Sequence, residues 1–97
     1  MDFLVFSYKY QKTISLTLPS VFNDTKIGEV PANADICSIV NCFGVRNNGQ
    51  KWVIPNYYTS DDIADVYIAN NNDISARAKG LFVSMPIYLT IQYTKTT

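Results

Sequence analysis

The chain contains no histidine, carries no excess charge of either sign and has no long apolar run. Without histidine, it lacks the commonest general base and the commonest metal ligand of proteins. Its eight basic and eight acidic residues cancel, and the basic residues are dispersed from Lys9 to Lys95. Nucleic-acid binding usually needs basic residues clustered on one face. No apolar run approaches the roughly 20 residues of a transmembrane helix. We therefore expect neither nucleic-acid binding nor membrane insertion.

Catalytic and targeting motifs are equally scarce. Nucleophilic catalysis needs an activated side chain beside a base, and no Gly-x-Ser-x-Gly motif is present. The first residues lack both the basic region and the cleavage site of a signal peptide. We expect a protein that is not an enzyme and that uses no cofactor.

Only two cysteines are present, Cys37 and Cys42. Five residues apart in a regular strand, they would point to opposite faces and lie about 16 Å apart. A disulfide requires much closer α-carbons, and two thiols without histidine cannot complete a zinc site. The prediction is therefore two buried free thiols and no metal, which fits folding in a reducing cytoplasm.

The residues that are abundant favour β-strands. Ile, Val and Thr make up 26 of the 97 residues, and Tyr and Phe add 12 more. Apolar and polar residues alternate over 13–18, 74–79 and 87–94, which is the period of a half-buried strand. Turn signals recur between such segments, and no segment shows convincing helical periodicity. We predict one all-β domain over residues 1–97, a small antiparallel β-sandwich or jelly-roll with at least six strands.

The first half of the chain is expected to contain a long loop, a buried strand and a hairpin. Residues 19–35 have the composition of a loop, with one short strand or turn near Val21 and Phe22. Residues 36–45 are apolar on both faces, which is typical of a strand in the core or against another subunit. Asn48 and Gly49 predict a type I′ turn that leads into a return strand over 51–54.

The second half is expected to open with a polar loop over residues 56–65. A single helical turn is possible from Asp61 to Tyr67, with Ser60 as its N-cap. A strand is expected over 66–69, and the turn of residues 70–73 has short polar side chains that tolerate a left-handed backbone.

Aromatic residues near polar loops are the best candidates for a ligand site. Aromatic rings stack on the apolar faces of sugars, and short polar side chains bond sugar hydroxyls. The candidate residues are Trp52, Tyr57, Tyr58, Asp61, Asp62 and Asn71.

Each candidate also has a plainer interpretation. Trp52 also fits the core, the two tyrosines fit a subunit interface, and Asn71 fits an ordinary turn. Asp61, Asp62 and Asp65 supply oxygens of the kind that calcium prefers. Because they lack the ordered spacing of a calcium loop, we expect a solvated loop rather than a metal site.

The end of the sequence carries a family resemblance, through the run Leu89-Thr90-Ile91-Gln92-Tyr93-Thr94-Lys95-Thr96-Thr97. With the segments 64–68 and 74–77, this run resembles the ends of bacteriophage tail-fibre and baseplate receptor-binding proteins. The segment Phe43–Pro55 is similar to their strand-turn-strand tip pattern. The motif is structural rather than catalytic.

The resemblance implies a small antiparallel β-sandwich or jelly-roll, usually a homotrimer, that attaches a virion to a host surface glycan or protein. It places the protein in the virion tail after assembly in the host cytoplasm. It assigns no binding residue, because receptor-contact loops vary between such proteins. Since the sequence starts at Met1 without a fibrous shaft, we expect either an excised tip domain or a separate small virion protein. Two other functions stay open: a structural virion or assembly component that binds only protein, and a small polysaccharide-active enzyme.

Overall fold

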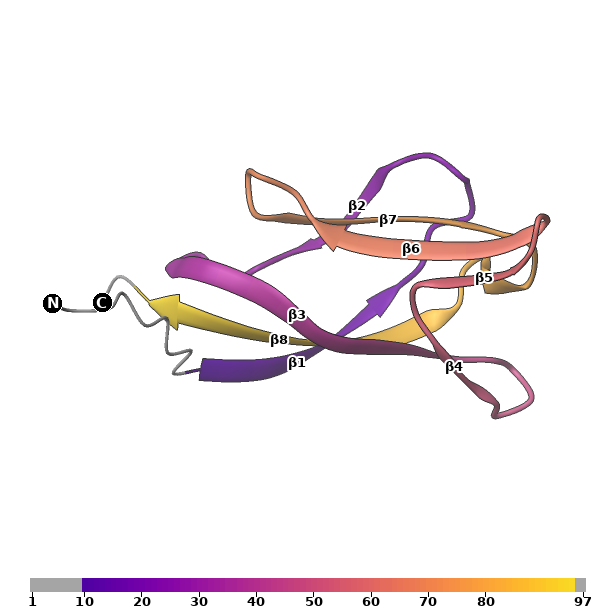
Figure 1. The fold of residues 1–97 in the computed structure, drawn as a ribbon, viewed down its shortest axis with the longest axis horizontal. Coiled ribbons are helices and arrows are strands. Elements are labelled where there is room, and N and C mark those ends of the chain that lie inside the picture. The colour runs from indigo at the N-terminus through magenta and orange to yellow at the C-terminus, as the bar shows by residue number, and fades with distance from the viewer. Residues whose placement is uncertain (1–9, 96–97) are drawn as a thin grey trace, which may run out of the picture.

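The computed structural model describes residues 10–95 of the 97-residue chain. The last two residues of the tail-fibre-like run lie outside this range. The described residues form eight strands and one short 3₁₀ helix (Figure 1). The elements are β1 (Tyr10–Thr17), β2 (Thr25–Glu29), β3 (Ala34–Val45), β4 (Lys51–Val53), β5 (Asn56–Thr59), β6 (Asp62–Ile68), β7 (Asp73–Lys79), η1 (Gly80–Phe82) and β8 (Pro86–Lys95).

The strands form two four-stranded antiparallel sheets that pack face to face (Figure 1). Sheet A has the order β1-β8-β3-β4, and sheet B has the order β2-β7-β6-β5. The prediction of an all-β fold is confirmed, and of the two architectures left open the β-sandwich describes the molecule. Tyr10 opposes Tyr93 in the β1–β8 pair, so both described ends lie at the same end of the sandwich.

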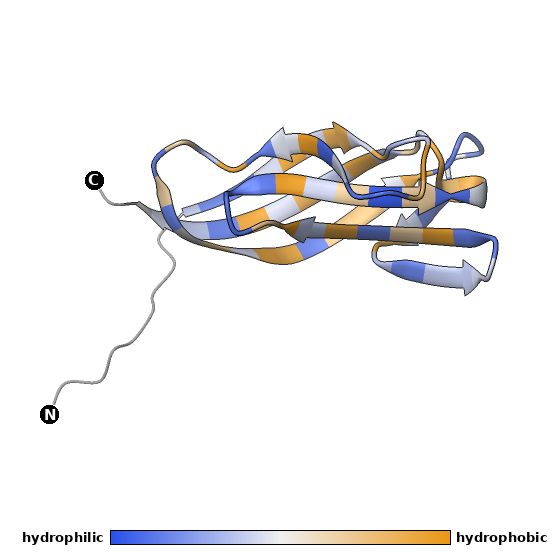
Figure 2. Ribbon diagram, turned by 90° about the horizontal axis from the view of Figure 1, so that it is seen from above, coloured by the Kyte–Doolittle hydropathy of each residue, from blue (hydrophilic) through white to orange (hydrophobic). Residues whose placement is uncertain are grey.

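The core lies between the inner faces of the two sheets. On β8, which is paired on both sides, Ile87, Leu89 and Ile91 are completely buried. On β7, the facing layer of sheet B is made of Ile74, Ala76 and Ala78, which are also completely buried. Figure 2 shows the alternation of apolar and polar residues along the strands. This period-two pattern puts every second side chain between the sheets, where burial of apolar surface stabilises the fold.

Two predicted loops contain strands instead. β2 lies inside residues 19–35 and pairs with β7, although its sequence includes Gly28 and two charged residues. Residues 56–65 form most of the β5–β6 hairpin, so the predicted polar loop and the possible helical turn from Asp61 are both wrong. The sequence did not indicate these strands because polar residues and Gly28 interrupt the apolar alternation in β2 and β5.

Two segments between strands are irregular. Residues 81–85 contain the rest of η1 and a turn that leads into β8. Where a short strand or turn was expected near Val21 and Phe22, the structure has a bend, and the Ala78 backbone N–H donates a hydrogen bond to the Val21 carbonyl at 3.1 Å.

The hairpin between β3 and β4 has a three-residue turn rather than the predicted type I′ turn. The Gly49 N–H donates to the Arg46 carbonyl at 2.8 Å, and the Arg46 N–H donates to the Gln50 carbonyl at 2.8 Å. Gly49 has φ of +87°, whereas Asn48 is not left-handed. A three-residue hairpin loop of this kind is a type I turn followed by a bulge, so it needs only one left-handed residue, whereas a type I′ turn needs two. The β6–β7 turn repeats these bonds with Asn72 at φ of +68°, which confirms the left-handed backbone expected in residues 70–73.

Cys37 and Cys42 face the same side of sheet A, and the prediction of opposite faces is wrong. Cys37 opposes Tyr93 and Cys42 opposes Leu89, and both of these partners are buried on the inner face. The register of β3 shifts between residues 39 and 41, and a β-bulge of this kind inserts one extra residue. Both thiols are free, with Cys42 buried and Cys37 half-buried.

Candidate ligand-binding groove

Tyr57 and Tyr58 are neighbours on β5 but point to opposite sides of sheet B. Tyr57 opposes Ile63 and lies on the outer face of the sheet, where it is 70% exposed. Tyr58 contacts the Trp52 ring edge-on, with the ring centroids 5.1 Å apart. Strand alternation therefore separates the two tyrosines, and only Tyr57 offers its ring on the outer face.

The outer face of sheet B is hollowed beside Tyr57. The hollow has a volume of about 600 Å³ and lies within the range of small-molecule sites. We call it the Tyr57 groove; it is lined by Phe22, Pro55, Asn56, Tyr57, Ile63, Asp65 and Arg77. An adjoining hollow shares Pro55, Asp65 and Arg77 and extends towards Asp24 and Tyr67. The groove therefore combines aromatic rings with polar groups over an extended surface.

Arg77 organises the polar part of the groove. Its Nε donates to Asp65 Oδ2 at 2.8 Å, across the directly opposed pair of β6 and β7. Its guanidinium carbon also lies 4.4 Å from the centre of the Phe22 ring, and Lys79 Nζ lies 4.8 Å from the same centre. Cations attract the faces of aromatic rings at these distances. Arg77 and Lys79 therefore fix Phe22, a residue of an irregular segment, against the strands.

The two aspartates of the predicted site lie in and beside the β5–β6 turn. Asp62 Oδ2 accepts the Thr59 hydroxyl at 2.6 Å, and Asp62 Oδ1 accepts the Leu81 backbone N–H at 2.9 Å. The Thr59 hydroxyl, then this N–H, and then the positive charge of Arg46 lower the pKa of Asp62. Asp62 thus ties the turn to η1 with both oxygens, whereas Asp61 is exposed. Asp62 has a structural role here, and neither aspartate lines the Tyr57 groove.

Asn71 and Trp52 also lie away from the Tyr57 groove. Asn71 follows the far end of β6 from Asp62, so a strand rise of about 3.3 Å per residue separates them by roughly 20 Å. Its carboxamide is bonded to Asp73 at 3.1 and 3.2 Å. The half-buried Trp52 packs edge-on against the buried Phe82. The structure therefore does not bring Asn71 together with the other candidate residues.

The groove residues that sequence reasoning missed come from three separate segments. Asp65 was predicted to lie in a polar loop and Arg77 in an alternating strand, and their pairing depends on the register of β6 with β7. Phe22 gave no local signal, because an aromatic residue in a loop reads equally well as core. Among the candidates, only Tyr57 lines the groove.

The described residues hold neither a cluster of metal ligands nor a membrane-spanning helix. Within residues 10–95, no group of three or more histidine, cysteine or acidic side chains is placed to hold a metal ion. Over the same range, no helix is long and apolar enough to cross a membrane.

Comparison with known proteins identifies no relative. No family model matches the chain, and neither the curated proteins nor the solved structures contain a significant match.

Proposed function

We propose that this chain is a non-enzymatic receptor-binding tip domain of a bacteriophage tail, which attaches the virion to a host cell-surface glycan through the Tyr57 groove. The observation that carries the proposal is an open groove that presents a 70%-exposed tyrosine ring beside polar side chains. Such a ring stacks on the apolar face of a sugar, and Arg77 and Asp65 offer donors and acceptors for its hydroxyls. The tail-fibre-like end of the sequence supports the same assignment.

The number and pairing of carboxylates in the Tyr57 groove support sugar binding rather than sugar hydrolysis. Glycosidases use a pair of carboxyl groups on opposite sides of the scissile bond. In the Tyr57 groove, Asp65 is ion-paired with Arg77 at 2.8 Å and is the one acidic residue among the described lining residues. A groove that holds sugar without cutting it suits an attachment protein.

Self-association belongs to the same proposal. Phe43 and Tyr88 stack on the outer face of sheet A with ring centroids 5.2 Å apart, beside Val53, which is 71% exposed. Exposed apolar patches commonly mark protein interfaces. A homotrimer held through this patch would present three grooves, and avidity would raise weak single-site affinity without new contacts.

A glycan array tests the proposal directly. The domain is displayed on beads so that sites of about 0.1–1 mM affinity, or roughly 4–5.5 kcal/mol, become detectable through avidity. We expect binding to a restricted set of glycans, and loss of that binding in Tyr57→Ala beads. If the folded domain binds no glycan but captures a virion protein, the protein-binding alternative replaces the proposal. Turnover of a polysaccharide would instead establish the enzyme alternative.

Sedimentation tests the self-association. At micromolar concentration we expect a species larger than the 10.9 kDa monomer. Val53→Lys should shift it towards the monomer, because a charge in an apolar interface loses its hydration. Val21→Lys is the matched control, because Val21 is 47% exposed and lies outside the patch. A monomer for the parent chain, or equal effects of the two variants, would argue against this interface.

A further inference from the structure

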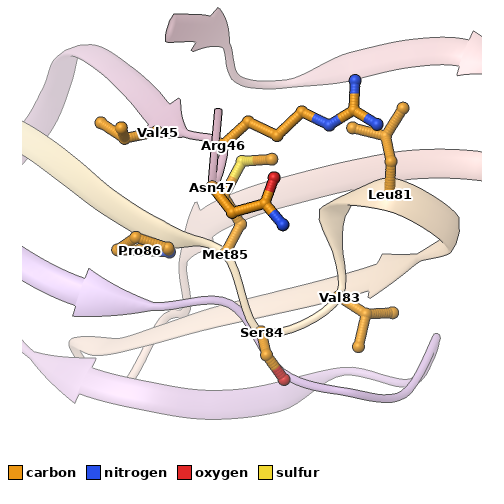
Figure 3. Close-up of a pocket in the computed structure, with 8 residues that line it drawn as sticks. All are labelled: Val45, Arg46, Asn47, Leu81, Val83, Ser84, Met85 and Pro86. Carbon is orange, nitrogen blue, oxygen red and sulfur yellow. The ribbon is translucent and has the colours of Figure 1, made fainter. Parts of the chain in front are cut away.

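A second pocket lies between the β3–β4 hairpin and the segment that joins η1 to β8 (Figure 3). Its volume is about 310 Å³, at the lower end of the range for small-molecule sites. Arg46 and Asn47 supply its polar groups, and its apolar surface comes from Leu81, Val83, Met85 and Pro86. We call it the Arg46 pocket. A small ligand with one polar and one apolar side fits this division.

The N–H donors of the Arg46 side chain are available to a ligand. Within residues 10–95, its guanidinium forms no hydrogen bond and no ion pair. The charge of Arg46 contributes to the lowered pKa of Asp62, but the two Asp62 carboxylate oxygens accept hydrogen bonds from Thr59 and Leu81 instead. A guanidinium presents its N–H groups as a planar fork that matches a carboxylate or a phosphate. Figure 3 shows the Arg46 side chain reaching across the pocket towards Leu81, with the Asn47 amide beside it.

The walls of the Arg46 pocket are held by backbone bonds. On the hairpin side, the two bonds between Arg46 and the residues Gly49 and Gln50 close the turn. On the other side, Ser84 adopts φ of +58°, a left-handed conformation that is uncommon for a residue other than glycine. Its N–H donates to the Pro19 carbonyl at 3.3 Å. Backbone strain of this kind persists where surrounding structure imposes it, and it is often found at binding sites.

We propose that the Arg46 pocket is a second ligand site, distinct from the Tyr57 groove, that binds a sugar-sized molecule carrying a carboxylate or a phosphate. The anionic group pairs with the free donors of Arg46, the Asn47 amide adds a hydrogen bond, and the apolar side of the ligand covers Leu81 and Val83. This assignment does not depend on what the Tyr57 groove binds.

The test is a titration of the whole chain with three probes, in which binding is monitored through the NMR chemical shifts of the backbone amides. The probes are glucuronic acid, glucose 6-phosphate and neutral glucose. We expect one or both anions to shift the amides of Asn47, Leu81 and Ser84 saturably, and glucose to leave them unchanged. Comparison of the first two probes identifies whether carboxylate or phosphate is preferred. Equal shifts with glucose, or no shift with either anion, would overturn the proposal.

Variants separate the Arg46 pocket from the Tyr57 groove. Arg46→Gln should weaken anion binding at least tenfold, and Arg46→Lys should weaken it less, because it keeps the charge and loses the fork. Arg77→Gln, which removes the arginine of the groove, is the matched control and should leave the titration unchanged. Asn47→Asp, at an exposed turn position, should also weaken binding by repulsion, and it provides an independent test if Arg46→Gln fails to fold. Retained binding in folded Arg46→Gln or in Asn47→Asp would refute the site.

Discussion

Replacement of Tyr57 by alanine should remove most of the binding energy of a stacked sugar while leaving the fold intact. The ring is 70% exposed and lies on an edge strand, so it contributes little to the core. Surface substitutions away from special features usually change stability by no more than about 0.5 kcal/mol. For a domain of this size, that corresponds to a change in Tm of about 2–4 °C.

The expected loss of affinity follows from the area of the ring. An aromatic side chain offers about 150–250 Å² of surface, so 70% exposure leaves about 100–175 Å² accessible at Tyr57. A sugar on one face covers roughly half of this area, and at about 25 cal/mol per Å² the contact is worth about 1.3–2.2 kcal/mol. Since about 1.4 kcal/mol is a factor of ten, Tyr57→Ala should weaken binding about 10- to 40-fold.

The assay is an NMR titration with the glycan that the array identifies, because the affinities are weak. Tyr58→Ala is the matched control: the residue type is the same, the position is adjacent, and the ring lies on the opposite side of the sheet against Trp52. Tyr57→Phe should retain most of the affinity, since it keeps the stacking face. The reasoning is refuted if folded Tyr57→Ala binds like the parent chain, or if Tyr58→Ala weakens binding equally.

Three further predictions concern stability and thiol chemistry. Hydrogen bonding to Thr59 lowers the pKa of Asp62, so the charged carboxylate stabilises the fold above the ordinary pKa of 3.8, and this contribution is lost as the pH falls through the lowered pKa. The Tm difference between the parent and Asp62→Asn should therefore shrink from pH 7 to pH 2.5. A constant Tm difference would contradict this prediction. Gly49→Ala should lower the free energy of unfolding by about 1–2 kcal/mol, because Gly49 has φ of +87° and its surroundings are open. Gly80→Ala should lower the Tm much further, because its new methyl group would lie 2.1 Å from an Asp62 oxygen. Equal melting temperatures of the two variants would argue against this crowding. Burial raises the pKa of Cys42 to about 11. Iodoacetamide at pH 8 should therefore label Cys42 far more slowly in the folded than in the unfolded protein. Equal labelling rates would exclude a buried thiol.

The strands that the sequence predicted best are those with one buried and one solvated face. The alternation in residues 13–18, 74–79 and 87–94 corresponds to β1, β7 and β8, because these segments place the apolar side chains of one face in the core or against it. β2 and β5 were not predicted because both are short and their polar residues and Gly28 interrupt the apolar alternation.

Local pattern also failed where register decides which side chains meet. The bulge near Val40 reverses the face of every later residue of β3 and brings Cys42 to the same side as Cys37. In the candidate groove, Tyr57 could be proposed from its aromatic character and polar neighbours. Its partners Phe22 and Arg77 could not, since they join it only through strand pairing and a loop that folds over sheet B.

The shared location of the two described ends sets how the domain responds to mechanical load. Tyr10 and Tyr93 are directly opposed, so a force that pulls these ends apart peels β1 from β8 one bond at a time. β5, the strand that carries Tyr57, and the β3–β4 hairpin lie towards the opposite end of the sandwich (Figure 1). A load applied between that end and the two described ends therefore acts along the strands rather than across them. The sandwich should withstand such a load better than a force that separates the two described ends from each other.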